Sequence, residues 1–278
     1  MKKFTGILIV SDVDGTYLSK SALTKNIEAI ERFKEQGGLF TFATGRDFPA
    51  LLEVIPDAAN IANAPIIVAN GAQIYDFARD KYIYDCPVAD KALLIDIIKR
   101  VLKKYPETGV RFSCEHNMIV PELCDMLRRD LEGYSLEKLG VTEMPMDELV
   151  GSDIKIYKVV LVDRDTAENL EGIRAICKEF DKNGELYFAK SYWCGLEVVN
   201  VNGSKGQAAL QLKDYVSAQT LYAIGDYEND IEMLKVADIS ASPENALDEV
   251  KRFAKIITSH CDDGAVADLI GIIEREYI

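Results

Sequence analysis

Short apolar runs alternate with helical patterns through the first 70 residues of the chain. The runs are almost wholly apolar, as is typical of strands that are buried on both faces of a parallel sheet. Between the first two runs, Ile27, Ile30 and Phe33 share one face of a helical pattern that ends at Gly37-Gly38. This alternation predicts βαβ units. The predicted strands are residues 7–10, 39–43 and 66–69, and the predicted helix is residues 26–36.

The pattern changes after Gly71, where short strands follow one another with turns between them. Such neighbours predict antiparallel pairs, interspersed with helices, in an α+β module. The predicted strands are residues 74–76, 81–84, 111–114, 118–120, 154–162 and 186–189, and the helices are residues 88–105 and 166–180.

The first pattern returns near residue 196. Strands are predicted at residues 196–199, 221–224, near 239 and at 255–257, with helices at 204–215 and 265–276. We therefore predict an α/β core domain (1–80 and 192–278) interrupted by an inserted α+β domain (81–191). By length alone, the middle block could instead continue one sheet.

Composition supports a folded protein and argues against some partners. The 278 residues are 48% hydrophobic and 28% charged, and 46 acidic against 32 basic residues give a net charge of −14. A nucleic-acid-binding protein carries a basic patch, and the sequence shows none. The acidity also argues against binding to anionic membranes. An anionic substrate stays compatible, because a metal ion and local basic residues can reverse the field at a site.

The cysteine pattern and the first residues indicate a cytoplasmic protein. The six cysteines are scattered without a C-x-x-C pair, so we expect reduced thiols rather than disulfides or a metal cluster. Met1-Lys2-Lys3 and the following apolar run resemble a secretory signal only weakly, because Asp12 stops the run and no cleavage site follows. No segment approaches the roughly 20 apolar residues of a membrane helix.

Polar residues follow several predicted strands at the point where each strand ends. Asp12 and Asp14 follow the first strand, Thr44 and Arg46 the second, and Asp226 a later one. Lys205 lies at a predicted helix start, and Glu228, Asn229 and Asp230 come just after Asp226. Parallel strands place their carboxyl ends at one edge of the sheet, so we expect these groups to converge.

Converging aspartates, a hydroxyl and a lysine suit phosphoryl chemistry. Mg2+ binds carboxylates together with substrate phosphate, and lysine neutralises further charge. One carboxylate can attack phosphorus, and a second can move protons. Each motif alone stays ambiguous, because Asp-x-Asp-Gly also occurs in metal-free turns and Lys205 alone would be an ordinary helix residue. Their joint occurrence at strand ends carries the prediction.

The ordered motifs resemble those of the haloacid dehalogenase (HAD) superfamily. The spacing is similar to its Cof-type sugar-phosphatase branch with a class IIB cap, over nearly the whole chain. The motifs are Asp12-Val13-Asp14-Gly15-Thr16, Ala43-Thr44-Gly45-Arg46, Asn70-Gly71-Ala72, Gly203-Ser204-Lys205-Gly206 and Gly225-Asp226-Tyr227-Glu228-Asn229-Asp230. The resemblance implies a Rossmann-like core and a Mg2+-dependent phosphoric monoester hydrolase that acts through an aspartyl-phosphate intermediate.

The resemblance also implies residue roles. Asp12 would be the nucleophile and a metal ligand, and Asp14 the general acid/base and a ligand through its backbone carbonyl. Asp226 would be a further metal ligand, with Asp230 supporting the metal's water shell. The substrate phosphate and its leaving group would be held by Thr44, Gly45, Arg46, Lys205 and Asn229.

The chain departs from the family pattern late in the core. Ser240-Ala241-Ser242-Pro243-Glu244-Asn245-Ala246 lacks the usual glycine before Asn-Ala, and Asp263-Gly264-Ala265-Val266-Ala267 carries an extra alanine. These departures put loop contacts in doubt rather than the chemistry. Candidate substrate contacts in the cap are Arg111, His116, Asn117, Tyr192 and Trp193. Packing at the domain hinge is the favoured alternative for Tyr192 and Trp193, and a turn position is favoured for His116.

The expected substrate is a small phosphorylated metabolite, foremost a sugar phosphate. A phosphorylated vitamin precursor and pyridoxal phosphate also suit a capped site. Two alternatives to hydrolysis stay open: a phosphotransferase or phosphosugar mutase of the same superfamily, and a non-catalytic phospho-accepting regulator. The sequence indicates no oligomeric state.

Overall fold

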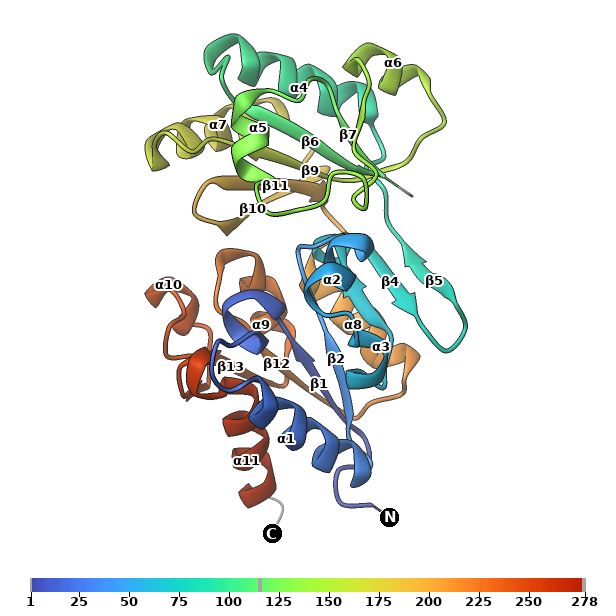
Figure 1. Ribbon diagram of the computed structural model, residues 1–278, viewed down its shortest axis with the longest axis vertical. Coiled ribbons are helices and arrows are strands. Elements are labelled where there is room, and N and C mark those ends of the chain that lie inside the picture. Colours follow the sequence, from blue (N-terminus) through green and yellow to red (C-terminus); the bar gives the residue numbers. More distant parts are fainter. Residues whose placement is uncertain (1, 115–116, 277–278) are drawn as a thin grey trace. The chain divides into compact units, whose positions relative to one another are not determined.

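The computed structural model describes residues 2–114 and 117–276. The chain forms two compact units (Figure 1). The first consists of Met1–Asp85 and Ser204–Ile278, and the second consists of Cys86–Gly203. Each unit has a hydrophobic core of its own, so each is described by itself.

The first unit contains a five-stranded parallel sheet in the order β14-β13-β12-β1-β2. Its strands are β1 (Ile7–Ser11), β2 (Leu39–Phe42), β12 (Thr220–Ile224), β13 (Ile239–Pro243) and β14 (Ile256–Thr258). Every residue of the central strand β1 is buried. This burial explains why the strand is apolar from Ile7 to Val10 instead of alternating.

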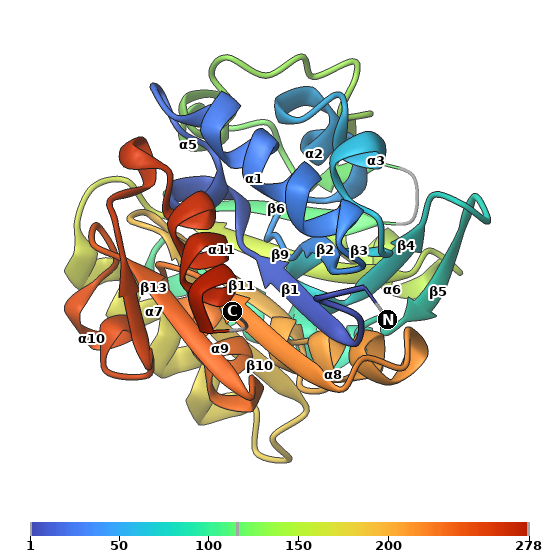
Figure 2. The same cartoon turned by 90° about the horizontal axis from the view of Figure 1, so that it is seen from below.

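Helices cover both faces of this sheet. On one face, α1 (Leu23–Glu35) and α11 (Ala265–Glu276) lie side by side, and Ile30 and Ile270 pack with Ile9 of β1 (Figure 2). On the other face, Ala208 of α8 (Lys205–Tyr215) and Met233 of α9 (Ile231–Val236) pack with Val10. Short helices complete the unit: α2 (Phe48–Val54), α3 (Ala58–Ile61) and α10 (Asp248–Lys251). The parallel sheet therefore lies between two helical layers.

A second, three-stranded antiparallel sheet belongs to the same unit. Its strands are β3 (Ile66–Val68), β4 (Gln73–Asp76) and β5 (Lys81–Asp85). The two sheets are linked by one parallel bridge between Ala43 and Ile67. The prediction that residues 66–69 form a further strand of the parallel sheet is therefore wrong, because β3 pairs along its length with β4.

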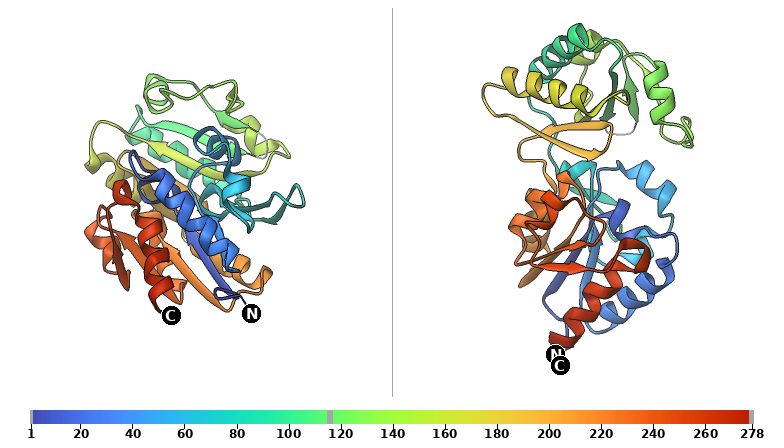
Figure 3. Two further views of the ribbon diagram at one scale, coloured as in Figure 1. Left: turned by 60° about the horizontal axis from the view of Figure 1, so that its bottom comes forward. Right: turned by 90° about the vertical axis from the view of Figure 1, so that its left-hand side faces the viewer.

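The second unit is a six-stranded sheet covered by helices. Its order is β10-β11-β9-β6-β7-β8, antiparallel except for the β7-β8 pair. The strands are β6 (Gly109–Cys114), β7 (Met118–Val120), β8 (Thr142–Glu143), β9 (Ile156–Val162), β10 (Leu186–Tyr192) and β11 (Gly195–Asn200). The helices are α4 (Lys91–Lys104), α5 (Asp125–Asp130), α6 (Met146–Gly151) and α7 (Ala167–Phe180). Helices α4 and α7 lie side by side (Figure 3), and their apolar residues pack with Phe112, Val159 and Leu196 of the sheet.

The limits of the two units differ from the predicted domain limits for a physical reason. The hairpin strand β5 pairs with β4, so the first unit continues to Asp85 rather than to residue 80. The strand predicted at residues 196–199 pairs with β9 and β10, so the second unit continues to Gly203 rather than to residue 191. In both places a strand stays with the sheet to which it is hydrogen-bonded.

Gly71 provides a test of how tightly the first unit packs near Lys205. Its φ is +106°, and a Cβ there would lie 2.2 Å from the backbone oxygen of Ser204. We expect Gly71→Ala to lower the free energy of unfolding by the cost of a positive φ, about 1–2 kcal/mol, plus about 1–3 kcal/mol for overpacking. Urea-induced unfolding of the full chain measures this difference.

The matched control is Gly6→Ala. Gly6 has a φ of +86°, but the three heavy atoms nearest to an added Cβ all belong to the flexible Gln219 side chain, the closest at 3.2 Å. Gly6→Ala should therefore lower the free energy of unfolding only by the cost of a positive φ, without the cost of overpacking. Equal losses in the two variants would contradict the close approach of Gly71 to the start of α8.

Candidate active site

The register of the parallel sheet brings three chain segments to one edge. Ser11, the last residue of β1, pairs with Ile224 of β12 on one side and with Phe42 of β2 on the other. Because these strands end level with one another, the residues that follow them emerge together. Asp12 follows β1 directly, and its N–H continues the ladder by donating to the Ile224 carbonyl at 2.9 Å.

Lys205 joins two of the carboxylates at this edge. It is the first residue of α8, whose N-cap is Ser204. Its Nζ lies 2.5 Å from Asp12 Oδ1 and 2.7 Å from Asp230 Oδ1, and its side chain is fully buried. A buried lysine is stable only when hydrogen-bonded counter-charges surround it. Asp12 and Asp230 supply these charges from segments more than 200 residues apart.

Asp226 and Asp230 are held by backbone and hydroxyl donors. Asp230 Oδ2 accepts the N–H groups of Asp226 and Tyr227, at 3.0 and 3.1 Å, which closes the turn η3 (Glu228–Asp230). Thr16 donates its hydroxyl to Asp226 Oδ1 at 2.7 Å. One carboxylate oxygen each from Asp12, Asp226 and Asp230 lies within 4.8 Å of the other two.

These carboxylates outnumber the lysine between them. Three carboxylates carry three negative charges when ionised, and Lys205 offsets one. Burial with this imbalance favours either a retained proton or a bound cation. Oxygen donors at this spacing suit a hard divalent ion such as Mg2+.

The pKa values show the same imbalance. Burial raises the pKa of Asp12 well above its usual range, and the neighbouring aspartates add to the effect of burial while Lys205 opposes it. Burial and Asp230 raise the pKa of Asp226 to about 7. Burial alone would lower the pKa of Lys205, but Asp12 and Asp230 outweigh it and raise that pKa above the ordinary value. Lys205 is therefore a permanent cation, and the carboxylates around it still outnumber it.

Asp14 lies apart from the three carboxylates. It sits within the irregular turn η1 (Val13–Tyr17), and its side chain is half exposed. Arg46 holds it in a bidentate ion pair, with Nε and Nη2 each 2.8 Å from a carboxylate oxygen. This fork fixes the orientation of the Asp14 carboxylate, although an exposed pair adds little stability.

The other predicted site residues also lie at the carboxyl edge of the first unit's sheet. Thr44 is buried, and its Oγ1 accepts the Arg46 N–H at 3.1 Å. Gly45 follows it and is partly buried. Asn229 is buried and donates from Nδ2 to Asn70 Oδ1 at 2.9 Å. Asn229 is therefore engaged with a side chain of η2 (Ala69–Gly71).

Three further residues hold this site, although none of them was predicted to take part in the chemistry. Thr16 and Asn70 lie within the motifs given above, so their positions in the sequence could have indicated a part in the site. Asn245 lies in the late segment where the chain departs from the family pattern, and it reaches the site only through folding: its Nδ2 donates to the Gly15 carbonyl at 2.7 Å. Gly15 itself has a φ of +79°, and a Cβ there would lie 2.4 Å from Asp226 Oδ2.

The candidate cap residues lie in the second unit, where two of them share a cluster. Arg111 contacts both Asp130, at 3.1 Å, and the Tyr192 hydroxyl, at 3.3 Å. Tyr192 donates to Asp130 at 2.9 Å. Asn117 donates to Thr142, and Trp193 is 57% exposed. His116, the remaining candidate, lies outside the described residues.

The fold and the clustered carboxylates define an α/β enzyme with an acidic site at the carboxyl edge of a parallel sheet. The family model of the haloacid dehalogenase-like hydrolases matches residues 9–270, and the chain belongs to this family. The predicted superfamily and α/β fold class are thereby confirmed.

The similarity to known relatives and solved structures extends over nearly the whole chain. It is 27% identical to the 5-amino-6-(5-phospho-D-ribitylamino)uracil phosphatase YwtE of Bacillus subtilis, over 94% of this chain and 96% of that protein. It is 23% identical to the phosphatase YitU of the same organism, named for the same substrate, over 97% of each. The structure of the HAD subclass IIB sugar phosphatase BT4131 covers 98% of this chain and 99% of its own, with a TM-score of 0.80 and 19% identity.

These matches place the chain in the phosphoric monoester hydrolase class, as predicted. The likeness to BT4131 shows the fold alone. In the part of the chain that the structure describes, no helix is both long and apolar enough to cross a membrane.

The raised pKa of Asp226 predicts how stability depends on pH without metal. The folded pKa is about 7 against an ordinary 3.8, so the folded state binds the proton more tightly than the unfolded state does. The resulting stabilisation is complete below about pH 4 and is lost as the pH rises through 7, at up to about 1.4 kcal/mol per pH unit. Urea-induced unfolding in EDTA at a series of pH values measures this slope.

The variant Asp226→Asn keeps the size of the side chain and removes its titration. Its free energy of unfolding should fall less steeply between pH 4 and 7 than that of the unsubstituted chain. An unchanged slope would show that another group causes the pH dependence.

Proposed function

We propose that this chain is a Mg2+-dependent phosphatase that hydrolyses small phosphorylated metabolites, foremost sugar phosphates, through an aspartyl-phosphate intermediate. The observation that carries the proposal is the group formed by Asp12, Asp226 and Asp230, with one buried lysine among them. Its excess negative charge suits a divalent cation, and the family is one of hydrolases.

Asp12 and Asp226 would hold Mg2+ through their side chains and Asp14 through its backbone carbonyl, with Asp230 supporting the water shell. Bound Mg2+ supplies the positive charge that offsets repulsion between a carboxylate nucleophile and a phosphate dianion. Lys205 supplies a second positive charge beside Asp12. Thr44, Gly45 and Asn229 would bind phosphoryl oxygens with their hydroxyl, amide and side-chain donors.

In the first step, an Asp12 carboxylate oxygen forms a bond to phosphorus while the bond from phosphorus to the leaving oxygen breaks. Asp14 gives its proton to that leaving oxygen. In the second step, Asp14 takes a proton from water as the water oxygen attacks phosphorus. The bond between Asp12 and phosphorus then breaks and releases inorganic phosphate.

Arg46 would hold Asp14 in place before substrate binds and would then face the leaving group. Its bidentate pair with Asp14 supports this role, because the pair fixes the carboxylate that must move protons. The second unit would act as the cap that supplies the leaving-group contacts. The relatives' named substrate is a phosphate ester of a ribityl chain, so phosphorylated vitamin precursors belong in the substrate screen beside sugar phosphates.

Replacing the nucleophile should abolish turnover without unfolding the chain. Asp12→Asn keeps the shape of the side chain and leaves Lys205 paired with Asp230. We expect phosphate release from a generic aryl phosphate to fall by about 10³-fold or more. Circular dichroism should show an unchanged fold.

The matched control is Asp76→Asn, because Asp76 is also a buried aspartate of the first unit but lies in β4. The control should retain most of the activity. Substantial Mg2+-dependent turnover in Asp12→Asn would reject Asp12 as the nucleophile.

Metal removal tests the cation separately. EDTA should abolish phosphate release, and added Mg2+ should restore it. In Asp226→Asn, at least about tenfold more Mg2+ should be needed for half-maximal activity, because one carboxylate ligand is lost. Full activity in EDTA after exhaustive dialysis would reject a metal-dependent mechanism.

A further inference from the structure

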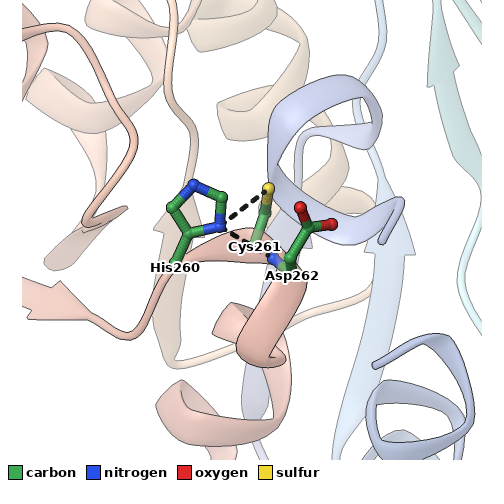
Figure 4. Close-up of side chains that lie close together, drawn as sticks. All are labelled: His260, Cys261 and Asp262. Carbon is green, nitrogen blue, oxygen red and sulfur yellow. Dashed lines mark hydrogen bonds between the residues drawn. The ribbon is translucent and has the colours of Figure 1, made fainter. Parts of the chain in front are cut away.

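A second group of metal-ligating side chains lies outside the three-aspartate group. His260, Cys261 and Asp262 are consecutive residues at the start of the turn η4 (Cys261–Asp263), between β14 and α11. One donor atom of each, an imidazole nitrogen, the thiol sulfur and a carboxylate oxygen, lies within 4.8 Å of the other two. Figure 4 shows the three side chains rising from the same turn.

The spacing of the two softer donors matches that of ligands on a tetrahedral ion. Cys261 Sγ lies 3.7 Å from His260 Nδ1. Two ligands on one tetrahedral zinc, at about 2.3 Å for sulfur and about 2.0–2.1 Å for nitrogen, are about 3.6 Å apart. His260 and Cys261 would therefore need little movement to share one ion. The Asp262 carboxylate would bind through its second oxygen or give up the Lys20 N–H that its Oδ1 accepts at 2.9 Å.

The donor types select a different metal from the one proposed for the active site. The three aspartates offer only oxygen, which suits Mg2+. Imidazole and thiolate together favour Zn2+ and related ions. We propose that His260, Cys261 and Asp262 bind one thiophilic divalent cation of the Zn2+ class, with water in the fourth position.

Two of the three residues already accept backbone hydrogen bonds, and Asp262 Oδ1 accepts the Lys20 N–H at 2.9 Å. His260 Nδ1 accepts the Asp262 N–H at 3.1 Å and so caps η4. Metal binding would take over this lone pair, and coordination of the thiolate would release the Cys261 thiol proton to solvent. Occupancy would therefore reorganise the first residues of η4.

Two hydrogen bonds connect η4 to the active-site turn. The Cys261 N–H donates to Asn245 Oδ1 at 2.8 Å, and Asn245 Nδ2 donates to the Gly15 carbonyl at 2.7 Å. Gly15 lies beside Asp14 and packs against Asp226. Metal binding at His260–Asp262 would disturb this connection and lower phosphatase turnover. This consequence rests on the proposed function, whereas the metal site itself does not.

Co2+ is the probe for the site, because cobalt bound to thiolate absorbs in the near ultraviolet. The full chain is titrated with Co2+ in excess Mg2+, which occupies the all-oxygen group. We expect one equivalent of Co2+ to produce the thiolate absorption band. Cys261→Ser removes the sulfur, and His260→Asn removes the imidazole while keeping a good capping side chain.

Both variants should bind Co2+ at least about tenfold more weakly. Cys124→Ser is the matched control, since Cys124 is a partly exposed free thiol of the second unit, and it should keep the band. Absence of the band in the unsubstituted chain, or its persistence in Cys261→Ser, would overturn the site.

Turnover in saturating Mg2+ tests the connection to the active site. Zn2+ should inhibit the unsubstituted chain, and Cys261→Ser should need at least about tenfold more Zn2+ for the same inhibition. Equal inhibition of both proteins would show that Zn2+ acts at the aspartates and would reject the connection. Should the chain release no phosphate at all, the Co2+ titration still decides the site.

Discussion

The first unit's site depends on one interaction, the pairing of the buried Lys205 ammonium with Asp12 and Asp230. Removing a charge from water is costly, and the cost is met only where counter-charges with good hydrogen-bond geometry surround it. Asp12 and Asp230 provide these from the end of β1 and from η3. The ends of β1, α8 and η3 must therefore meet for the chain to fold with this lysine inside. The constraint that stabilises the fold is thus the same one that assembles the site.

Tight packing keeps the remaining groups in place around that lysine. Gly15 and Gly71 both adopt positive φ angles, and neither leaves room for a side chain against Asp226 or the start of α8. Thr16 and the backbone N–H groups at η3 orient Asp226 and Asp230. The lysine does not balance all the carboxylates, so the ionised site carries an excess of negative charge. Burial, together with the charge of Asp230, raises the pKa of Asp226, and the excess negative charge makes the group receptive to a cation.

In the second unit the buried charged residues lie on one face of the sheet rather than at the ends of its strands. One face of its sheet is apolar and is covered by α4 and α7. On the opposite face, Lys158 of β9 pairs with Glu197 of β11 at 3.1 Å, both buried, and Arg111 pairs with Asp130. Strand geometry explains this separation, because side chains alternate between the two faces of the sheet along each strand. Arg111, Val160 and Glu197 occupy paired positions and therefore share a face.

The sequence by itself determined the element types, the α/β class and the residues that follow the strands. Buried parallel strands read as apolar runs, and Asp12, Thr44 and Asp226 stand out because polar side chains interrupt the pattern there. Only tertiary structure decided which strands pair: β3 and β11 have the composition of core strands, yet they join β4 and β9. Only folding could reveal the contacts of Asn245 and the pairing of Asp230 with Lys205. The reason is physical: burial and periodicity are local and leave a mark on the sequence, whereas partners distant along the chain are chosen by packing and by the need to compensate buried charge.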